Sequence, residues 1–218
     1  VNNSASIVGA DVNTTFVQAG TNTSNGIDKV FAINPFCTTP IGATLSNLTI
    51  RFGRNTQANP NPLGDFSESG GGIDACNTGT GSFVMLTVNV DQNTNVNAYG
   101  GGVNFDSALT SGPTWLLNGV SITGNRTTSA ASVTKTGGGL NLKGDAHNVT
   151  IINSTFSGNI SASEGGGVFV NHTNGGAISI SASTISNNTA ASRGGGVSNA
   201  NFDFGAATLS IINDSIIS

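Results

Sequence analysis

Charged side chains are scarce in this chain of 218 residues, and their scarcity excludes several classes of function. Lys and Arg together number 7 and Asp and Glu number 11, which gives a formal net charge of −4. A protein that binds nucleic acid or an anionic lipid surface needs clustered cations. The basic residues here are scattered singly along the sequence. The sequence therefore predicts no nucleic-acid partner.

Long hydrophobic runs are also missing, together with most of the residues that metal and cofactor sites require. No run approaches the roughly 20 apolar residues of a membrane-spanning helix, so no membrane insertion is expected within this segment. The chain has two histidines, and His172 has no partner at a spacing typical of metal ligands. We expect neither a cofactor nor a metal ion.

The chain is instead rich in glycine, with 31 residues, and carries a repeat. The tripeptide Gly-Gly-Gly opens each unit, and each unit also contains an apolar residue, two variable residues and an asparagine. The triplets begin at Gly70, Gly100, Gly137, Gly165 and Gly194, and the asparagines are Asn55, Asn93, Asn125, Asn159 and Asn188. A repeat of about 30 residues with few helix formers is typical of a solenoid.

Aligning the units on the asparagine reveals columns of apolar residues that alternate with small polar ones. The column ten residues before the asparagine contains Leu45, Phe83, Trp115, Val149, Ile178 and Leu209. The column three residues before it contains Phe52, Val90, Ile122, Phe156, Ile185 and Ile216. In a further column, eight residues before the asparagine, the first unit departs because Asn47 stands among apolar residues. Alternation with period two indicates half-buried strands.

These columns predict an all-β fold, specifically a right-handed single-stranded parallel β-helix. About six coils would each supply three short strands separated by Gly or Asn corners, and the right hand follows from the preference of parallel crossovers. We expect one domain over residues 1–218, with an N-terminal coil or cap at 1–29 and repeat coils at 30–218. The last unit stops one residue short of its asparagine without a capping segment, which predicts a fragment of a longer solenoid.

Both repeat motifs have local structural explanations. Glycine adopts positive φ without steric cost and lets neighbouring backbones approach closely. Asparagine tolerates the left-handed conformation at a corner, and its amide can bond the next coil, which predicts an inward asparagine ladder. A phosphate-binding glycine loop is the competing interpretation, but no helix start follows any triplet.

Two pairs of residues are predicted to meet across neighbouring coils. Cys37 lies 18 residues before Asn55 and Cys76 lies 17 before Asn93, so the two cysteines occupy nearly equivalent places. Stacked strands bring such Cα atoms to about 5 Å, which favours a disulfide over two reduced, buried thiols. A disulfide would indicate a location outside the cytoplasm. Glu164 and Arg193 each precede a triplet, one coil apart, and should form a surface ion pair.

An enzyme that cleaves polysaccharides is the main alternative, because such chemistry needs clustered carboxylates or a base beside them. The candidates are Asp74 and Asp106 on the outward face of the strand after the triplet, followed one coil later by Lys143. Asp145 and His147 lie in the adjoining loop. The competing interpretation is a set of ordinary solvated residues.

Flat rows of Ser and Thr suggest a third class, proteins that bind ice or another crystal surface. The columns that contain Thr150 and Thr155 are mixed, however, and are interrupted by Val84, Leu116 and Arg51. A regular threonine array is missing, so this class is disfavoured.

The unit at residues 165–193, GGGVFVNHTNGGAISISASTISNNTAASR, resembles bacterial right-handed β-helix repeat proteins of the cell surface. It is similar in particular to the polymorphic outer-membrane-protein repeat, which is marked by a Gly-Gly-aliphatic triplet and an aromatic-x-x-Asn motif. The chain departs from that pattern in having Gly-Gly-Gly for the commoner Gly-Gly-Ala, and long insertions at 56–69 and 126–136. The resemblance implies surface display or secretion and specifies no activity.

The sequence thus favours an extracellular, non-catalytic β-helix module that acts as a stalk or adhesin-like rod. The two insertions would be displayed to a glycan or protein partner. The alternative is a polysaccharide-degrading enzyme or a glycan-binding module that uses the outward strand face.

Overall fold

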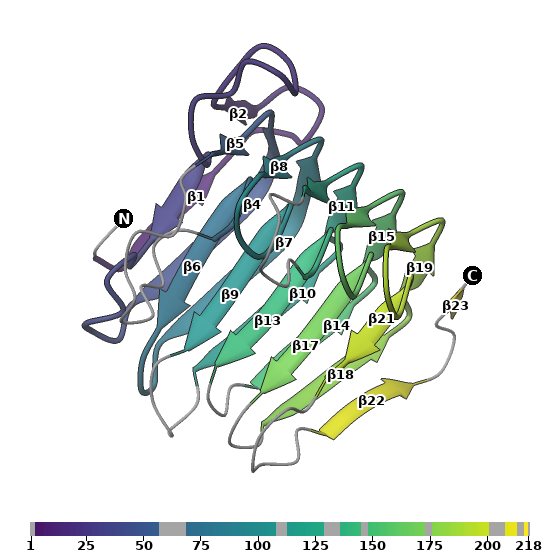
Figure 1. Cartoon of the computed structure of the whole chain (residues 1–218). Helices are drawn as coiled ribbons and strands as arrows, with labels where there is room; N and C mark the ends of the chain where they lie inside the picture. Colours follow the sequence, from purple (N-terminus) through teal and green to yellow (C-terminus); the bar gives the residue numbers. More distant parts are fainter. Residues whose placement is uncertain are drawn as a thin grey trace.

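The computed structural model describes residues 3–56, 69–107, 113–128, 136–144, 148–172, 176–200, 208–212 and 216–217. Within these ranges the chain forms strands and turns without any helix, so none of them holds a long apolar helix that could cross a membrane. The strands pair in parallel in three sheets. The all-β fold is confirmed, and the parallel sheets are compatible with the expected solenoid (Figure 1).

The three sheets differ in the length of their strands. The large sheet contains β1 (Ala5–Val8), β2 (Phe16–Gln18), β4 (Gly42–Arg51), β7 (Ser82–Asp91), β10 (Thr114–Asn118), β11 (Ser121–Thr123), β14 (Asn148–Ile152), β15 (Thr155–Ser157), β18 (Ala177–Ser181), β19 (Thr184–Ser186), β22 (Thr208–Ile212) and β23 (Ile216–Ile217). The triplet sheet, whose strands from β6 on follow the glycine triplets, contains β3 (Phe31–Ile33), β6 (Ile73–Asn77), β9 (Val103–Ser107), β13 (Leu140–Gly144), β17 (Val168–His172) and β21 (Val197–Asn199). The short-strand sheet contains β5 (Arg54–Asn55), β8 (Thr94–Asn95), β12 (Arg126–Thr127), β16 (Ile160–Ser161) and β20 (Thr189–Ala190).

The units from β3 to β20 each contribute to all three sheets in the same order, and the described residues of the last unit, in β21, β22 and β23, contribute to two of them. The unit that begins with β17 continues through β18 and β19 in the large sheet and ends with β20 in the short-strand sheet. The two-residue strands after the asparagine were not predicted, because two residues carry no visible alternation. The N-terminal segment joins the same arrangement, since β1 and β2 both pair with β4. Figure 1 shows the strands of successive units stacked side by side from the N-terminus to the C-terminus.

A bend with positive φ recurs at the same place in the large sheet. The bend residues are Asn47 (φ 54°), Thr87 (52°), Gly119 (64°), Asn153 (51°) and Ala182 (46°). In β4 and β7 the bend lies inside a continuous strand of ten residues, whereas in later units it separates two strands. Asparagine and glycine tolerate this conformation, and stacking against equivalent bends maintains it at Thr87 and Ala182.

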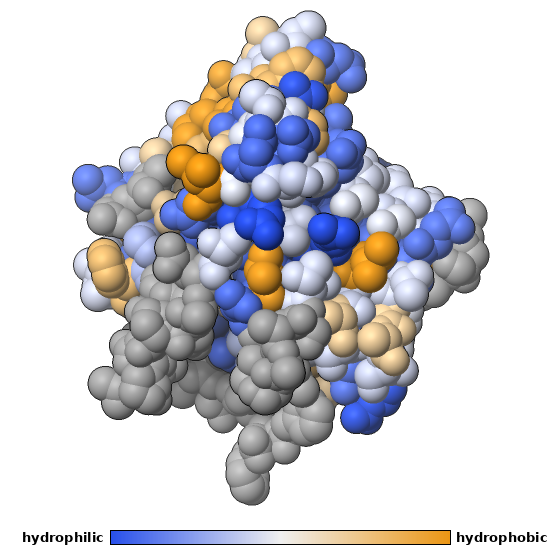
Figure 2. Space-filling view, turned by 45° about the horizontal axis from the view of Figure 1, so that its top comes forward, coloured by the Kyte–Doolittle hydropathy of each residue, from blue (hydrophilic) through white to orange (hydrophobic). Residues whose placement is uncertain are grey.

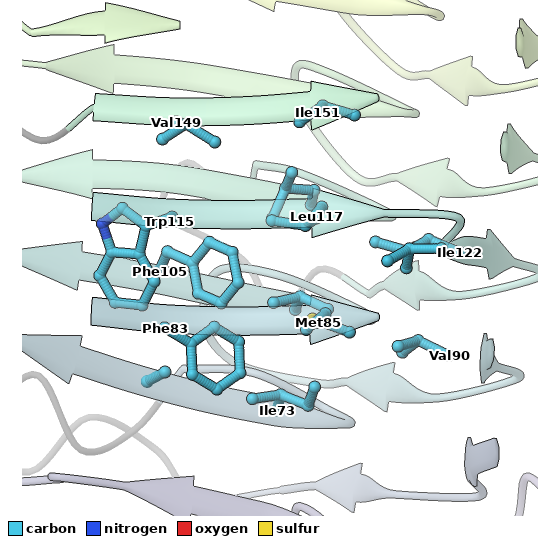
Figure 3. Close-up of a cluster of buried hydrophobic side chains, with 14 of the residues drawn as sticks. Ile73, Phe83, Met85, Val90, Phe105, Trp115, Leu117, Ile122, Val149 and Ile151 are labelled. Atoms are coloured by element: carbon cyan, nitrogen blue, oxygen red, sulfur yellow. The ribbon is translucent and has the colours of Figure 1, made fainter. Parts of the chain in front are cut away.

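The apolar columns face inward and form one continuous core between the sheets. Its largest side chains are aromatic, and three of them form a cluster, with Phe83 from one unit and Phe105 and Trp115 from the next. Phe105 and Trp115 stack with their ring centroids 4.3 Å apart, and Phe83 meets both rings edge-on at 5.1 and 5.6 Å. Figure 3 shows the three rings together between the strands. Aromatic contacts of this kind add about 0.5–1.5 kcal/mol each to simple burial.

The first unit is shifted by two residues from the alignment that its sequence predicts. Asn55 lies opposite Asn95, and Gly53 occupies the place that Asn93 has in the next unit. The assignment of Asn55 to the same column as Asn93 is therefore wrong. The shift removes the exception at Asn47, because Leu45 lies opposite Met85.

The shift also replaces Phe52 in the inward column. Ile50 lies opposite Val90 and is fully buried, whereas Phe52 adopts a φ of 58° at the corner before Gly53. The motif Phe-Gly-Arg-Asn resembles the repeat marker only by coincidence. At the other end of the column, Ile217 rather than Ile216 lies opposite Ile185.

The glycine triplets stack directly on one another. The backbone N–H of the second glycine in each triplet donates to the carbonyl oxygen of the first glycine in the next, as in Gly71 to Gly100 and Gly138 to Gly165. A Cβ atom on Gly138 would overlap the backbone of Ile160 and Gly166. The first glycine of each triplet has a positive φ of 62–71° and so a conformational reason, whereas the second has a reason of close approach only.

Candidate functional site

A ladder of asparagine side chains runs through the interior at the corner after the large sheet. The Oδ1 atom of Asn125 accepts hydrogen bonds from the backbone N–H (2.9 Å) and the Nδ2 (3.0 Å) of Asn93. Asn159 receives the same pair of bonds from Asn125, and Asn188 receives it from Asn159. Gly53 replaces the predicted Asn55 at the end of the ladder and donates its backbone N–H to Asn93. The ladder satisfies buried polar groups and leaves no amide exposed for chemistry at Asn93, Asn125 or Asn159.

The two predicted cross-unit pairs are both present. Cys37 and Cys76 form a disulfide with their Cα atoms 5.2 Å apart. The guanidinium of Arg193 lies 3.2 Å from the carboxylate of Glu164. Only the cation of this pair is at the surface, because the side chain of Arg193 is 71% exposed and that of Glu164 only 8%. Ser198 donates a further hydrogen bond to Glu164.

The two carboxylates that the enzyme alternative would use lie on the outer face of the triplet sheet but are not open to solvent. Asp74 and Asp106 are each 2% exposed, which is inconsistent with the interpretation as ordinary solvated residues. They also do not face each other, because Asp74 lies opposite Asn104 and Asp106 lies opposite Cys76. A carboxylate that acts on a polymer must reach the substrate. The burial of both groups therefore argues against this role.

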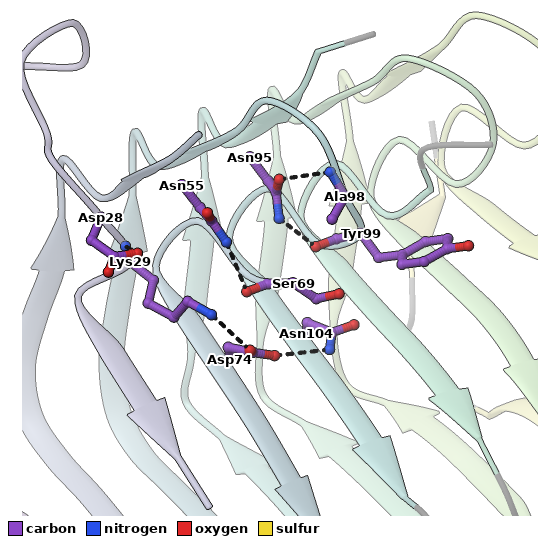
Figure 4. A network of polar contacts seen from close by, with 9 residues as sticks. All are labelled: Asp28, Lys29, Asn55, Ser69, Asp74, Asn95, Ala98, Tyr99 and Asn104. Carbon is purple, nitrogen blue, oxygen red and sulfur yellow. Dashed lines mark hydrogen bonds and ion pairs between the residues drawn. The ribbon is translucent and has the colours of Figure 1, made fainter. Parts of the chain in front are cut away.

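Asp74 is engaged by two neighbouring side chains (Figure 4). The ammonium of Lys29 lies 2.9 Å from Oδ2, and the amide of Asn104 donates to Oδ1 at 3.0 Å. Asn104 in turn accepts from Asn141, and Asn141 accepts from the hydroxyl of Thr136. This buried polar row crosses the three neighbouring strands β6, β9 and β13, and its hydrogen bonds link the units on the outer face as the asparagine ladder links them in the interior.

The other candidate residues of the enzyme alternative, Lys143, Asp145 and His147, are only partly described. Lys143 lies opposite Asp106, but its ammonium lies 4.7 Å from the centroid of the Tyr99 ring. Asp145 and His147 lie outside the described residues, as does the side chain of His172. In the described part of the chain, no three His, Cys, Asp or Glu residues gather in a way that could hold a metal ion.

Most of the two insertions also lies outside the described residues, which omit 57–68 and 129–135. Their attachment points are described. The first insertion follows β5 and the second begins with β12, and both of these strands belong to the short-strand sheet. They therefore start from the same edge of the molecule.

A second candidate site is a groove on the outer face of the large sheet that the sequence did not predict. It has a volume of about 250 Å³ and lies over β2, β4, β7 and β11. Its lining residues are Val12, Asn13, Phe16, Thr49, Arg51, Asn89, Asp91, Ser121 and Thr123. In the sequence Arg51 only interrupts a Ser/Thr column, and the two-residue shift of the first unit is needed to place it beside Asp91.

The surface around these sites is mixed in character. Figure 2 shows one face on which hydrophobic side chains form small, separate patches among hydrophilic and neutral ones. The exposed large hydrophobic side chains in the described ranges are Val8, Phe16, Ile27, Phe36, Ile160 and Ile211. Of these, only Phe16 borders the groove.

Comparison with known proteins adds no assignment to this geometry. The chain matches no family model, no curated protein and no solved structure. The resemblance to the polymorphic outer-membrane-protein repeat therefore remains a prediction from the motifs. The function has to be argued from the chain's own residues.

Proposed function

We propose that this chain is a right-handed parallel β-helix module of a secreted or cell-surface protein, with coils formed from the three sheets. It acts as a non-catalytic, stalk-like or adhesin-like rod. The observation that carries this proposal is the unbroken stacking of equivalent strands and glycine triplets from unit to unit. Solenoids of this kind are stabilised by contacts between neighbouring units and present extended surfaces.

Two further features support an extracellular rod. The disulfide between Cys37 and Cys76 fits an oxidising environment. The asparagine ladder and the polar row on the triplet sheet satisfy buried polar groups without leaving an open catalytic arrangement at those residues. The insertions at 56–69 and 126–136 start from one edge and would be displayed together to a glycan or protein partner.

A polysaccharide-degrading enzyme is the second candidate, favoured by one observation. Asp106 and Lys143 lie opposite each other on the triplet sheet, and the ammonium of Lys143 lies over the ring of Tyr99. An acid, a base and an aromatic ring are components of a glycan-cleaving site. The 2% exposure of Asp106 makes this candidate the weaker one.

A cleavage assay separates the two proposals. The protein would be incubated with a panel of acidic and neutral polysaccharides, with and without Ca²⁺, and both reducing ends and unsaturated products would be measured. We expect no turnover above that of a heat-denatured sample. Turnover that disappears in Asp106→Asn and persists in the exposed control Arg193→Gln would overturn the non-catalytic rod.

A further inference from the structure

The groove lies on the large sheet, whereas the polar row lies on the triplet sheet and β5 and β12 belong to the short-strand sheet. Its floor consists of outward-facing side chains from neighbouring strands in register. Arg51, Asp91 and Thr123 lie opposite one another in one row, and Thr49, Asn89 and Ser121 do so in the next. One wall comes from the N-terminal segment, where Val12 and Asn13 precede Phe16 on β2.

Arg51 is held in a fixed orientation at this groove. Its guanidinium lies 3.9 Å from the ring centroid of Phe16 and 4.9 Å from that of Phe52. Its Nε donates a hydrogen bond to Oε1 of Gln18 at 2.9 Å. Aromatic stacking with one anchored N–H leaves the outer edge of the planar group available to a ligand.

Asp91 is the neighbour of Arg51 in register, yet the two charges do not form an ion pair within the described structure. Oδ1 of Asp91 accepts from the hydroxyl of Thr123 at 2.9 Å, and Oδ2 accepts from the amide of Gln92 at 3.0 Å. A carboxylate has about four acceptor sites, so capacity remains for a ligand hydroxyl. The groove therefore presents a strong donor and a strong acceptor side by side, one strand spacing apart.

An apolar surface lies beside this pair. Phe16 is 44% exposed although Arg51 covers part of its ring. Asn89, Ser121 and Thr123 add neutral hydrogen-bonding groups on the strands beyond. An aromatic ring, a planar charged pair and small polar groups in an open groove match the two kinds of surface of a pyranose, which has C–H faces and hydroxyl edges.

We propose that this groove is a binding subsite for a neutral glycan. Adjacent hydroxyls of one pyranose would accept from Arg51 and donate to Asp91, while the sugar ring packs on Phe16. Because the charges of Arg51 and Asp91 offset each other, the pair has no net charge and does not favour an anionic sugar over a neutral one. This inference rests on the proposed function, since it names the class of partner that the rod would hold. It places that partner on the strands rather than on the insertions.

Calorimetric titration with defined neutral oligosaccharides tests the subsite. The probes are cellohexaose, laminarihexaose, chitohexaose and mannohexaose, with hexagalacturonate as the anionic comparison. We expect at least one neutral probe to bind. Asp91→Asn and Arg51→Gln should each weaken that binding about tenfold or more, because each leaves a buried ligand group unpaired. Phe16→Leu should weaken it by a smaller factor.

Ser186→Ala is the matched control, because Ser186 lies in the same row as Asp91, three strands away along the large sheet. Its binding should equal that of the unmodified chain. If Asp91→Asn unfolds by circular dichroism, the isosteric Thr123→Val replaces it, since it removes the hydroxyl that orients Asp91.

Three results would overturn the subsite: no neutral probe binding at millimolar concentration, binding unchanged in Asp91→Asn and Arg51→Gln, or a preference for hexagalacturonate. None of them would overturn the non-catalytic rod, which is tested by the cleavage assay. Conversely, turnover of a polysaccharide together with groove variants that lose binding would overturn the rod and retain the subsite.

Discussion

The N-terminal and C-terminal units share one repeat but are held together differently. Both are stacked by the same backbone hydrogen bonds and the same glycine contacts. The N-terminal units add a disulfide, a largely buried ion pair and a cluster of three aromatic rings. In the described C-terminal units the corresponding cross-link is an ion pair whose cation is 71% exposed.

Burial of the asparagine ladder also decreases toward the C-terminus. Asn93, Asn125 and Asn159 are fully buried, whereas Asn188 is partly exposed. The comparison shows that the repeat sets the register of the strands, whereas side-chain contacts between units decide how strongly a given unit resists local unfolding. Local unfolding is expected to be easiest where these contacts are fewest.

The largest expected effect comes from removing the centre of the ladder. Asn125→Ala would delete hydrogen bonds to Asn93, Asn159 and the carbonyl of Val90, and would leave buried groups unpaired. We expect a loss of about 5 kcal/mol in the free energy of unfolding. Asn188→Ala, at the partly exposed end, should cost about 1–2 kcal/mol. Urea titration measures both values, and equal losses would show that burial along the ladder does not set its contribution.

The disulfide is expected to come second. Cys37→Ser with Cys76→Ser should lower the free energy of unfolding by about 4 kcal/mol, from the closure entropy of a loop of 39 residues. Hydrogen exchange should accelerate in β3 and β6 while exchange in β18 and β19 stays unchanged. A uniform acceleration along the chain would contradict the idea that the tie acts on the N-terminal units alone. Reduction of the unmodified protein should reproduce the same pattern.

Breaking the buried ion pair should have the third largest effect. Lys29→Met leaves the 2% exposed Asp74 without its cation, which should cost about 3 kcal/mol. The double variant Lys29→Met with Asp74→Asn should recover part of this loss, because no uncompensated charge then remains. Urea titration of the single and double variants measures the difference. If the double variant is no more stable than the single one, burial of the charge is not the cause.

The smallest effect is expected at the C-terminal ion pair. Arg193→Gln should lower the free energy of unfolding by less than about 1 kcal/mol, because its guanidinium is largely solvated. The loss should diminish further in concentrated salt, as screening weakens an exposed pair. A loss as large as that of Lys29→Met would remove the contrast between the two ends of the molecule.

Much of the fold was predictable because it depends on local and repeated features. The triplets, the period-two columns and the ladder from Asn93 to Asn188 all follow from what glycine, asparagine and alternating strands can do. The pairs Cys37–Cys76 and Glu164–Arg193 followed from equivalent places in successive units. The two-residue strands such as β12 were missed because they are too short to show a period.

The candidate sites were less predictable, because the exposure of an outward-facing side chain depends on which other segments cover it. Asp74 and Asp106 are on the expected face, but only the structure shows that both are buried and that Asp74 bonds Lys29 and Asn104. The groove depends on segments distant in sequence, since Phe16 on β2 and Asp91 on β7 line it from the two sides of β4.

By itself, the sequence determined that this chain is an all-β repeat whose strands alternate inward and outward, because each unit must bury the same face against its neighbours. Only the tertiary structure decided the register of the first unit. There the motif Phe-Gly-Arg-Asn resembles the repeat marker. In the structure, however, the backbone N–H of Gly53 forms the last hydrogen bond of the ladder, and Ile50 occupies the inward position. Burial of Ile50 and pairing of β4 along its full length with β7 favour this register. Both contributions come from contacts with neighbouring strands, so a motif of four residues cannot reveal them.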